Sequence, residues 1–272
     1  MLVRVAHRTE YRYSQPLLGS VQYLRQTARS GAMQTVTRWK VACEGAELTE
    51  WTDHYGNVVH TVVLAKPSDR LAIEVQGEVT TVDTNGVVPT GMTGLPNPVY
   101  LRETPYTKAD ARLQKFAAGF RAGIKSEPIA GLHALMIAIR DAVAYEKGGT
   151  HVHTTASESL ALGRGVCQDH AHVFIAAARL LGVPTRYVSG YLAGPAEGTA
   201  RRESASHAWA EALVDGLGWV SFDCANGVSA TEAYVRVAVG LDYADAAPVR
   251  GVRTGGGQEE LAVSVEIDGH QQ

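Results

Sequence analysis

The stretch that decides the fold is GRGVCQDHAHVFIAAARLLGVPTRYVSGYL, residues 163–192. Apolar residues recur in it at helical spacing from Cys167 onward, until Gly182 ends the pattern and Pro184 follows. The extended run TRYVSGYL comes directly afterwards. The spacing therefore predicts a helix that begins at Cys167, behind a glycine turn, and leads into a strand.

Strand patterns fill the first hundred residues, and helical patterns begin after them. Prolines and glycines interrupt the chain between residues 88 and 107, and the segment 129–148 then has an apolar stripe at helical spacing. These patterns predict an α+β chain with a β-sandwich-like domain at residues 1–100 and a second domain at residues 101–272. The expected early strands are MLVRVAHRTEYRYS, TVTRWKVAC, NVVHTVVLA and RLAIEVQGEVTTVDT.

Composition excludes several classes of function. The net charge is -3 and no long basic run occurs, so the chain lacks the electrostatic footprint of a nucleic-acid-binding protein. No run of 18 apolar residues is present, and the first residues carry charges throughout, so we expect neither a membrane span nor a signal peptide. Three scattered cysteines argue against a disulfide framework, which makes the cytoplasm the expected location.

Cys167 occupies a position with chemical consequences. The unpaired N–H groups and the positive dipole end of a helix N-terminus favour an anion, and the thiolate is the nucleophilic form of cysteine. The backbone N–H of Cys167 also points to where the oxyanion of an attacked carbonyl would develop. The alternative is that Cys167 is a small buried apolar residue, so partner side chains must decide between the two interpretations.

Two alternating segments further along supply such partners. Alternation in SHAWAEA places three side chains on one face of a strand: His207, Trp209 and Glu211. The opposite face consists of alanines, which allow a helix to approach closely: Ala208, Ala210 and Ala212. Alternation in GWVSFDC likewise places three side chains on one face of the next strand: Trp219, Ser221 and Asp223.

The turn between these strands decides whether the base and the acid meet. A three-residue loop at 214–216 puts Gly216 in the left-handed position that such loops favour. It pairs Leu213 with Leu217 and sets His207 directly opposite Asp223. Thiolate, imidazole and carboxylate then form a series of nucleophile, base and orienting group.

The order of these motifs resembles the transglutaminase-like superfamily of papain-like thiol enzymes. GRGVCQDHAH, SHAWAEA and WVSFD are similar to its motifs, and HRTEYRYSQP, DHYGN and DYADAAPVRGVRTGGG resemble its bacterial members, which are commonly described as candidate cysteine proteases. The resemblance implies Cys167 as nucleophile, His207 as base and Asp223 as orienting acid. It also implies a β-rich N-terminal domain before a catalytic core of helices packed on an antiparallel sheet.

One departure from the family pattern lies beside the acid. The family usually has proline and threonine after the aspartate, whereas this chain has DCANG, with Cys224 and Ala225. We expect this change to loosen the turn without removing the acid, and we expect Cys224 to be packed because it alternates away from Asp223.

Three further residues are candidates for substrate binding. Gln168 could bond a substrate or a neighbouring loop. His170 lies about 60° from Cys167 around the helix and could compete as the base, although a histidine bonded within the protein is the alternative. Trp209 shares a face with His207, so it could line a cleft wall or belong to the core.

Metal chemistry is the main rival to thiol chemistry. His151 and His153 could share a face of a strand, but His170 and His172 diverge by about 200° on a helix and cannot clamp one ion together. A mixed site of the two loop histidines and one helix histidine, as in a zinc hydrolase, stays open, although no HExxH motif occurs. Because thiol chemistry is the preferred interpretation, we expect no metal site and no cofactor.

The sequence thus predicts an enzyme that forms a thioester on Cys167 and acts on a protein or peptide. The resemblance alone favours hydrolysis of a peptide or isopeptide bond over the other reactions. Transfer to an amine and deamidation of glutamine fit the same three residues. An inactive binding or scaffold protein that kept the fold is the alternative from another class. Nucleic acid and membranes are not expected partners, and the sequence leaves the oligomeric state open.

Overall fold

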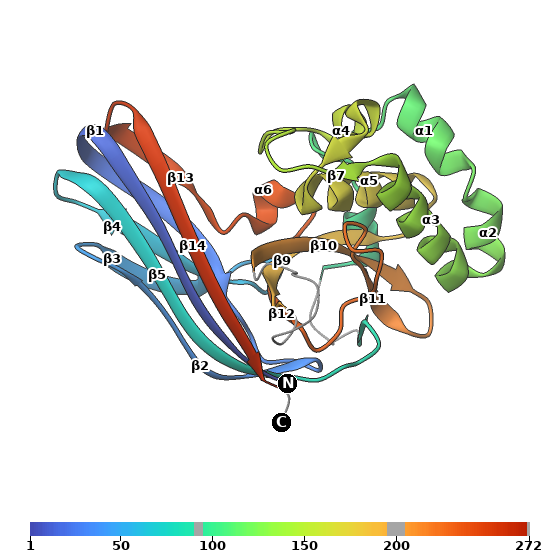
Figure 1. Ribbon diagram of the computed structural model, residues 1–272, viewed down its shortest axis with the longest axis horizontal. Helices are drawn as coiled ribbons and strands as arrows, with labels where there is room; N and C mark the ends of the chain where they lie inside the picture. The colour runs from blue at the N-terminus through green and yellow to red at the C-terminus, as the bar shows by residue number, and fades with distance from the viewer. Residues whose placement is uncertain (90–94, 195–204, 271–272) are drawn as a thin grey trace.

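The computed structural model describes residues 1–89, 95–194 and 205–270. It contains a curled sheet on one side and a helix-covered sheet on the other (Figure 1). The α+β organisation expected from the sequence is confirmed, with a β-rich N-terminal part and helices that pack on an antiparallel sheet.

The curled sheet is built around one long strand, β1 (Leu2–Thr27). β5 and then β4 run antiparallel along one side of β1, and β14 and β13 run antiparallel along the other. The outer strands β2 and β3 pair with β5 and β4. The bounds of these strands are β2 (Gln34–Cys43), β3 (Glu47–Thr52), β4 (Val58–Leu64), β5 (Ser68–Thr81), β13 (Val249–Gly255) and β14 (Glu259–His270).

The sheet changes register near the middle of β1. Pairing with β5 shifts between Arg12 and Leu17, and β13 gives way to β14 across Gly255–Gly257. These three glycines have φ values of 79°, 90° and 63°, which favour residues without a side chain. The TGGG segment is therefore an irregularity within a long strand that follows β1.

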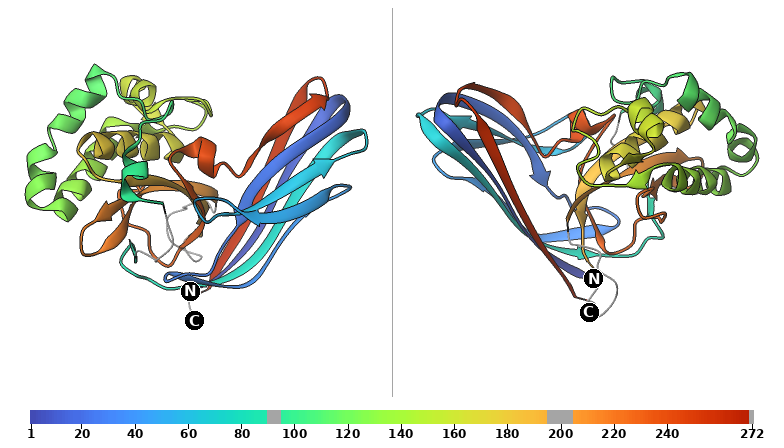
Figure 2. Two further views of the ribbon diagram at one scale, coloured as in Figure 1. Left: turned by 180° about the vertical axis from the view of Figure 1, so that it is seen from behind. Right: turned by 45° about the horizontal axis from the view of Figure 1, so that its top comes forward.

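Strands from both ends of the chain complete this sheet. Leu2 pairs with His270, so the two ends of the described chain lie side by side, as the views in Figure 2 show. Residues 249–270, expected in the second domain, are thus part of the N-terminal sheet. Val87–Val88, expected in the first domain, form β6 and pair with β11 of the other sheet.

The second sheet is antiparallel, with the order β12-β9-β10-β11-β6. Helices cover one of its faces, and the curled sheet lies toward the other (Figure 1). The strands are β9 (Thr185–Leu192), β10 (Ala205–Val214), β11 (Gly218–Phe222) and β12 (Tyr234–Gly240). The remaining elements are the 3-10 helix η1 (Asn97–Leu101), α1 (Ala111–Ala118), α2 (Arg121–Ser126), α3 (Pro128–Ala142), α4 (Ala156–Leu162), α5 (Cys167–Leu180), α6 (Tyr243–Ala246) and the parallel pair β7 (Ala144–Tyr145) and β8 (Arg164–Gly165).

Helix α5 is the centre of the helix-covered half. It begins at Cys167, as the sequence predicts, and its residues from Asp169 to Arg179 are buried. The alanine face of β10 packs in the same apolar cluster as α5. Phe174 of α5 stacks on Phe222 of β11 with ring centroids 4.9 Å apart. This packing fixes the N-terminus of α5 relative to the sheet.

The DHYGN turn joins the two sheets. The Asp53 carboxylate accepts from the backbone N–H groups of Tyr55 and Asn57, so it holds the turn closed. The Asn57 side chain then bonds both backbone groups of Val239 in β12, at 2.7 and 2.8 Å. Tyr55 OH donates to Asp245 Oδ2 at 2.6 Å. The turn therefore docks the curled sheet against the helix-covered half.

In the three described ranges, the helices are all too short or too polar to cross a membrane.

Candidate active site

The position of Cys167 depends on the turn that precedes α5. α4 ends at Gly163 with a φ of 67°, and Gly165 then lies against Asp169, where an added Cβ would meet the Asp169 side chain at 2.6 Å. The Asp169 carboxylate accepts from Val166 N–H at 2.8 Å and from Thr150 Oγ1 at 2.6 Å. Asp169 thus caps the helix, and Cys167 is held as its first residue, partly exposed.

The imidazole comes from β10 and the carboxylate from the end of β11. His207 Nε2 lies 2.6 Å from Asp223 Oδ2, and the side chains are only 8% and 1% exposed. The Cys167 side chain also hydrogen-bonds to the His207 ring. The structure thus brings Cys167, His207 and Asp223 together, in that order.

The register of this hairpin differs from the one predicted. Leu213 pairs with Trp219, and Val214 pairs with Gly218, so the three-residue loop is Asp215–Leu217. Gly216 does take the left-handed conformation, with a φ of 80°, but Leu217 belongs to the loop and is 47% exposed. The predicted register was wrong by two residues. A shift of two keeps every side chain on its face, which is why His207 and Asp223 still meet.

The environment shifts the pKa values of the pair in opposite directions. Burial lowers the pKa of His207, but hydrogen bonds with Asp223 and Cys167 and their electrostatic attraction outweigh it and raise the pKa to about 10. Burial raises the pKa of Asp223, but bonds to His207, Asn226 and Tyr234 hold it below its usual value. A protonated imidazole beside an ionised carboxylate is therefore the stable state at neutral pH.

Two residues that the sequence did not single out orient the carboxylate. Tyr234 OH donates to Asp223 Oδ2 at 2.7 Å, and Asn226 Nδ2 donates to the same oxygen at 2.6 Å. Asn226 lies three residues after Asp223, and a short polar side chain in a turn was the available signal. Tyr234 comes from β12 across the sheet, and no local pattern indicates that contact.

The DCANG turn is ordered by its own backbone bonds. Asp223 N–H donates to Val228 O at 2.9 Å, and Gly227 N–H donates to Asp223 O at 2.7 Å. Cys224 is buried in the main apolar cluster, as predicted. These backbone hydrogen bonds order the turn, although it lacks the proline of the family pattern.

The three candidate substrate-binding residues have partners within the protein. Gln168 Nε2 donates to Val152 O at 2.9 Å. His170 is buried with Nδ1 2.9 Å from Val166 O and Nε2 2.8 Å from Val143 O. Trp209 is buried, and its ring stacks on that of His207 with centroids 6.2 Å apart. In this structure the polar side chains of Gln168 and His170 are bonded to backbone carbonyls, and Trp209 packs against the imidazole.

The histidines of the metal alternative are not brought together. His172 is buried, and its Nε2 accepts from Tyr243 N–H at 3.1 Å. His153 Nδ1 lies 3.1 Å from Tyr106 OH. Within residues 1–89, 95–194 and 205–270, no group of three or more His, Cys, Asp or Glu side chains could hold a metal ion.

Comparison with known proteins agrees with this architecture. Residues 114–224 match the transglutaminase-like superfamily, and residues 3–80 match the bacterial transglutaminase-like N-terminal region. A solved structure, "a Putative Cysteine Protease from Cytophaga hutchinsonii", has the same fold, with a TM-score of 0.76 at 22% identity over 98% of this chain and 90% of that one.

Relatives of similar length also exist. The uncharacterized protein ML0607 of Mycobacterium leprae is 34% identical over 97% of this chain and 98% of its own length. The uncharacterized protein Rv2569c of Mycobacterium tuberculosis is 30% identical over 97% of this chain and 91% of its own length. By its two matched regions, its fold and these full-length relatives, the chain belongs to the transglutaminase-like superfamily.

Proposed function

We propose that the protein is a cysteine-dependent enzyme that acts on an amide or peptide bond through a thioester on Cys167, and that hydrolysis of a peptide or isopeptide bond is its reaction. One observation carries the proposal. The imidazole of His207 lies between the thiol and a buried carboxylate, hydrogen-bonded to both. This is the arrangement that activates a thiol and then protonates a leaving group.

The steps follow from the positions of the atoms. Sγ of Cys167 attacks the carbonyl carbon, and the backbone N–H at the start of α5 stabilises the oxyanion. The C–N bond breaks as the proton on His207 passes to the leaving nitrogen. Water then attacks the thioester, its proton passes to His207, and the thiolate of Cys167 is released with the acid product.

Transfer to an amine and deamidation of glutamine are variants of the same cycle. An amine in place of water gives transfer, and a glutamine side chain with water as the second reactant gives deamidation. The choice depends on how well the cleft excludes water. Hydrolysis needs no second binding site, and it is therefore the simplest reaction for these three residues.

An inactive scaffold is the competing class. The contacts argue against it, because a buried ion pair that serves no reaction costs desolvation and gives little stability in return. Asp223 nevertheless receives three side-chain bonds, and all of them align it with His207 or hold it in place.

We also propose a protein or peptide as the substrate, with no cofactor, nucleic acid or membrane partner, and a cytoplasmic location. All three cysteines are free, which suits a reducing compartment.

The test is incubation of the protein with glutamine-containing peptides, with and without a primary amine, followed by mass spectrometry. Cleaved peptides support hydrolysis, a mass gain of the amine supports transfer, and a gain of about one mass unit supports deamidation. Each product should disappear with Cys167→Ala and persist with Cys43→Ala. A product that survives Cys167→Ala would rule the proposal out.

A further inference from the structure

A cavity lies between the two sheets, away from Cys167. Its volume is about 560 Å³, which is in the range of small-molecule binding sites. Arg29, Arg186, Arg236, Trp219 and Tyr100 are among the residues that line it, whereas Cys167, His207 and Asp223 do not. The cavity therefore needs an explanation of its own.

Two arginines of the cavity wall, Arg186 and Arg236, share one carboxylate that does not itself line the cavity. Glu211 of β10 is 0% exposed and accepts from Arg186 Nε at 2.6 Å and from Arg236 Nε at 3.0 Å. One carboxylate between two guanidinium groups leaves one positive charge uncompensated. Arg29, which bonds Gly56 O at the rim, adds another positive charge. None of the described residues that line the cavity is an aspartate or a glutamate.

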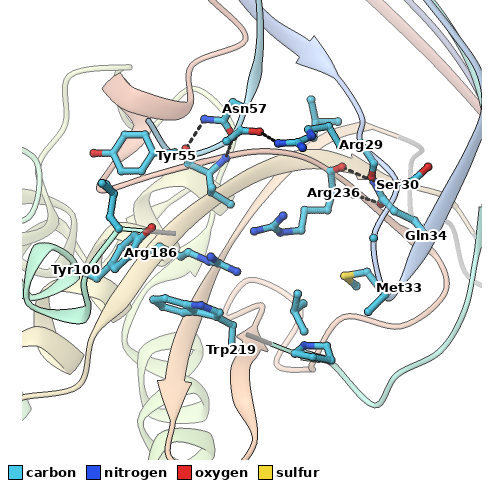
Figure 3. A pocket seen from close by; sticks show the side chains of 18 of the residues that line it. Arg29, Ser30, Met33, Gln34, Tyr55, Asn57, Tyr100, Arg186, Trp219 and Arg236 are labelled. Atoms are coloured by element: carbon cyan, nitrogen blue, oxygen red, sulfur yellow. Dashed lines mark hydrogen bonds between the residues drawn. The ribbon is translucent and has the colours of Figure 1, made fainter. Parts of the chain in front are cut away.

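The two buried arginines are fixed before any ligand arrives. The Arg186 guanidinium lies over the Trp219 ring, 4.0 Å from its centroid. The contacts with Glu211 use Nε and Nη2 of each arginine, which leaves the Nη1 hydrogens available to a ligand. Figure 3 shows both guanidinium groups pointing into the cavity and toward each other. Such a pair has the geometry to bridge the oxygens of one anion.

Burial does not remove the charge. It lowers the pKa of Arg186 to about 10, with Glu211 acting in the opposite direction, so the group stays cationic at neutral pH. Apolar side chains surround the cluster on the other walls, and they can contact a flat or apolar body: Met33, Tyr55, Val88, Leu95 and Tyr100. A cationic centre beside apolar side chains suits an organic anion better than a bare inorganic ion.

We propose that this cavity binds a small organic anion, a carboxylate or phosphate ester on an aromatic or apolar body, at Arg186 and Arg236. The site is separate from the thiol site. Trp209 and Tyr234, whose rings both contact His207, pack in one cluster with Met33 and Val88 of the cavity wall. This layer lies between the bound anion and the catalytic imidazole.

The test is calorimetric titration of the full chain with phenyl phosphate, benzoate and the neutral benzyl alcohol. One or both anions should bind and the alcohol should not. Arg236→Gln should weaken anion binding at least tenfold and Arg29→Gln several-fold. Arg12→Gln, a control on an exposed arginine of β1, should leave binding unchanged. Cys167→Ala should also leave it unchanged, which separates this proposal from the one about catalysis.

Two safeguards keep the result decisive. If circular dichroism shows that Arg236→Gln does not fold, the test uses Arg236→Lys and Arg29→Gln. Arg236→Lys keeps the positive charge but loses the paired donors of the guanidinium. Anion binding should change the fluorescence of Trp219, and Trp219→Phe should abolish that change. Absence of binding by both anions, or equal affinity in wild type and the folded Arg236 and Arg29 variants, would overturn the proposal.

Discussion

Tyr234 OH and His207 Nε2 contact the same oxygen of Asp223, at 2.7 and 2.6 Å. The carboxylate is thus fixed from β10 and β12 at once, and Asn226 holds it from the turn that follows. A carboxylate with three donors on one oxygen has little freedom to rotate. The base of the proposed mechanism is therefore oriented by the sheet itself.

Selective alkylation follows from the different environments of the three cysteines. Burial raises the pKa of Cys43 to about 11 and that of Cys224 well above its usual value. Cys167 is partly exposed beside a protonated His207. We expect iodoacetamide at pH 7 to modify Cys167 at least tenfold faster than the other two, as measured by peptide mass spectrometry. His207→Ala should remove the difference, and equal rates in the wild type would contradict the activated thiol.

Stability should depend on pH through His207. Its pKa is about 10 in the folded protein against 6.5 as the ordinary value, so the folded chain holds the proton more tightly. The stabilisation is complete below about pH 6.5 and is lost as the pH rises to about 10, at no more than about 1.4 kcal/mol per pH unit.

Urea unfolding of wild type and Asp223→Asn over that range measures this effect. The difference in unfolding free energy between wild type and Asp223→Asn should become smaller as the pH rises. Asp141, which forms an exposed ion pair with Arg140, supplies the control. The difference in unfolding free energy between wild type and Asp141→Asn should not vary with pH. A constant gap for Asp223→Asn would show that the pair does not titrate as described.

Tyr234→Phe tests the orienting role of the tyrosine. The change removes one donor from a buried carboxylate, so the pKa of Asp223 should rise and the unfolding free energy should fall by about 1.5–3 kcal/mol. Alkylation of Cys167 should also slow. Tyr106→Phe is a matched control, since its OH lies 3.1 Å from Nδ1 of the exposed His153. If Tyr234→Phe and Tyr106→Phe changed the alkylation rate of Cys167 equally, Tyr234 would have no orienting role.

Gly165→Ala should disturb the thiol through the cap of α5. The new Cβ would lie 2.6 Å from Asp169 Cβ and 2.7 Å from its Oδ2, so the cap must move. We expect a loss of about 1–3 kcal/mol and slower alkylation of Cys167. Gly31→Ala has nothing within 4 Å of its Cβ and should change neither quantity.

Asn57→Ala should weaken the junction between the sheets. The truncation leaves both the N–H and the C=O of buried Val239 without their side-chain partner, which costs about 2–4 kcal/mol. Thermal unfolding should show the loss, and Asn97→Ala, at an exposed position, should not. Loss of cooperativity would indicate that the two halves separate before they unfold.

Local patterns in the sequence predicted the elements that carry the site. The apolar stripe of α3 and the start of α5 at Cys167 are where periodicity placed them, and the stripe is buried throughout. Alternation also predicted the face of His207 and of Asp223. These features depend on spacing within a few residues, which a sequence displays directly.

Features set by distant contacts could not be predicted in the same way. The register of the hairpin was missed because β10 continues to Val214 and β11 begins at Gly218, with a φ of 100°, so the loop lies one residue later than the turn rule suggests. The contact of Tyr234 with Asp223 and the sharing of Glu211 by Arg186 and Arg236 arise across strands. Such contacts depend on sheet order, which no local pattern encodes.

The pairing of β14 with β1 has a consequence for how the protein is made. β1 leaves the ribosome well before its neighbour at Leu2–Tyr13, which is residues 259–270. Until those residues are synthesised, β1 exposes an open edge that could pair with another chain. Nascent molecules should consequently need a chaperone or rapid translation to avoid association, and cutting the gene after residue 248 should give an aggregating product, not a smaller folded protein.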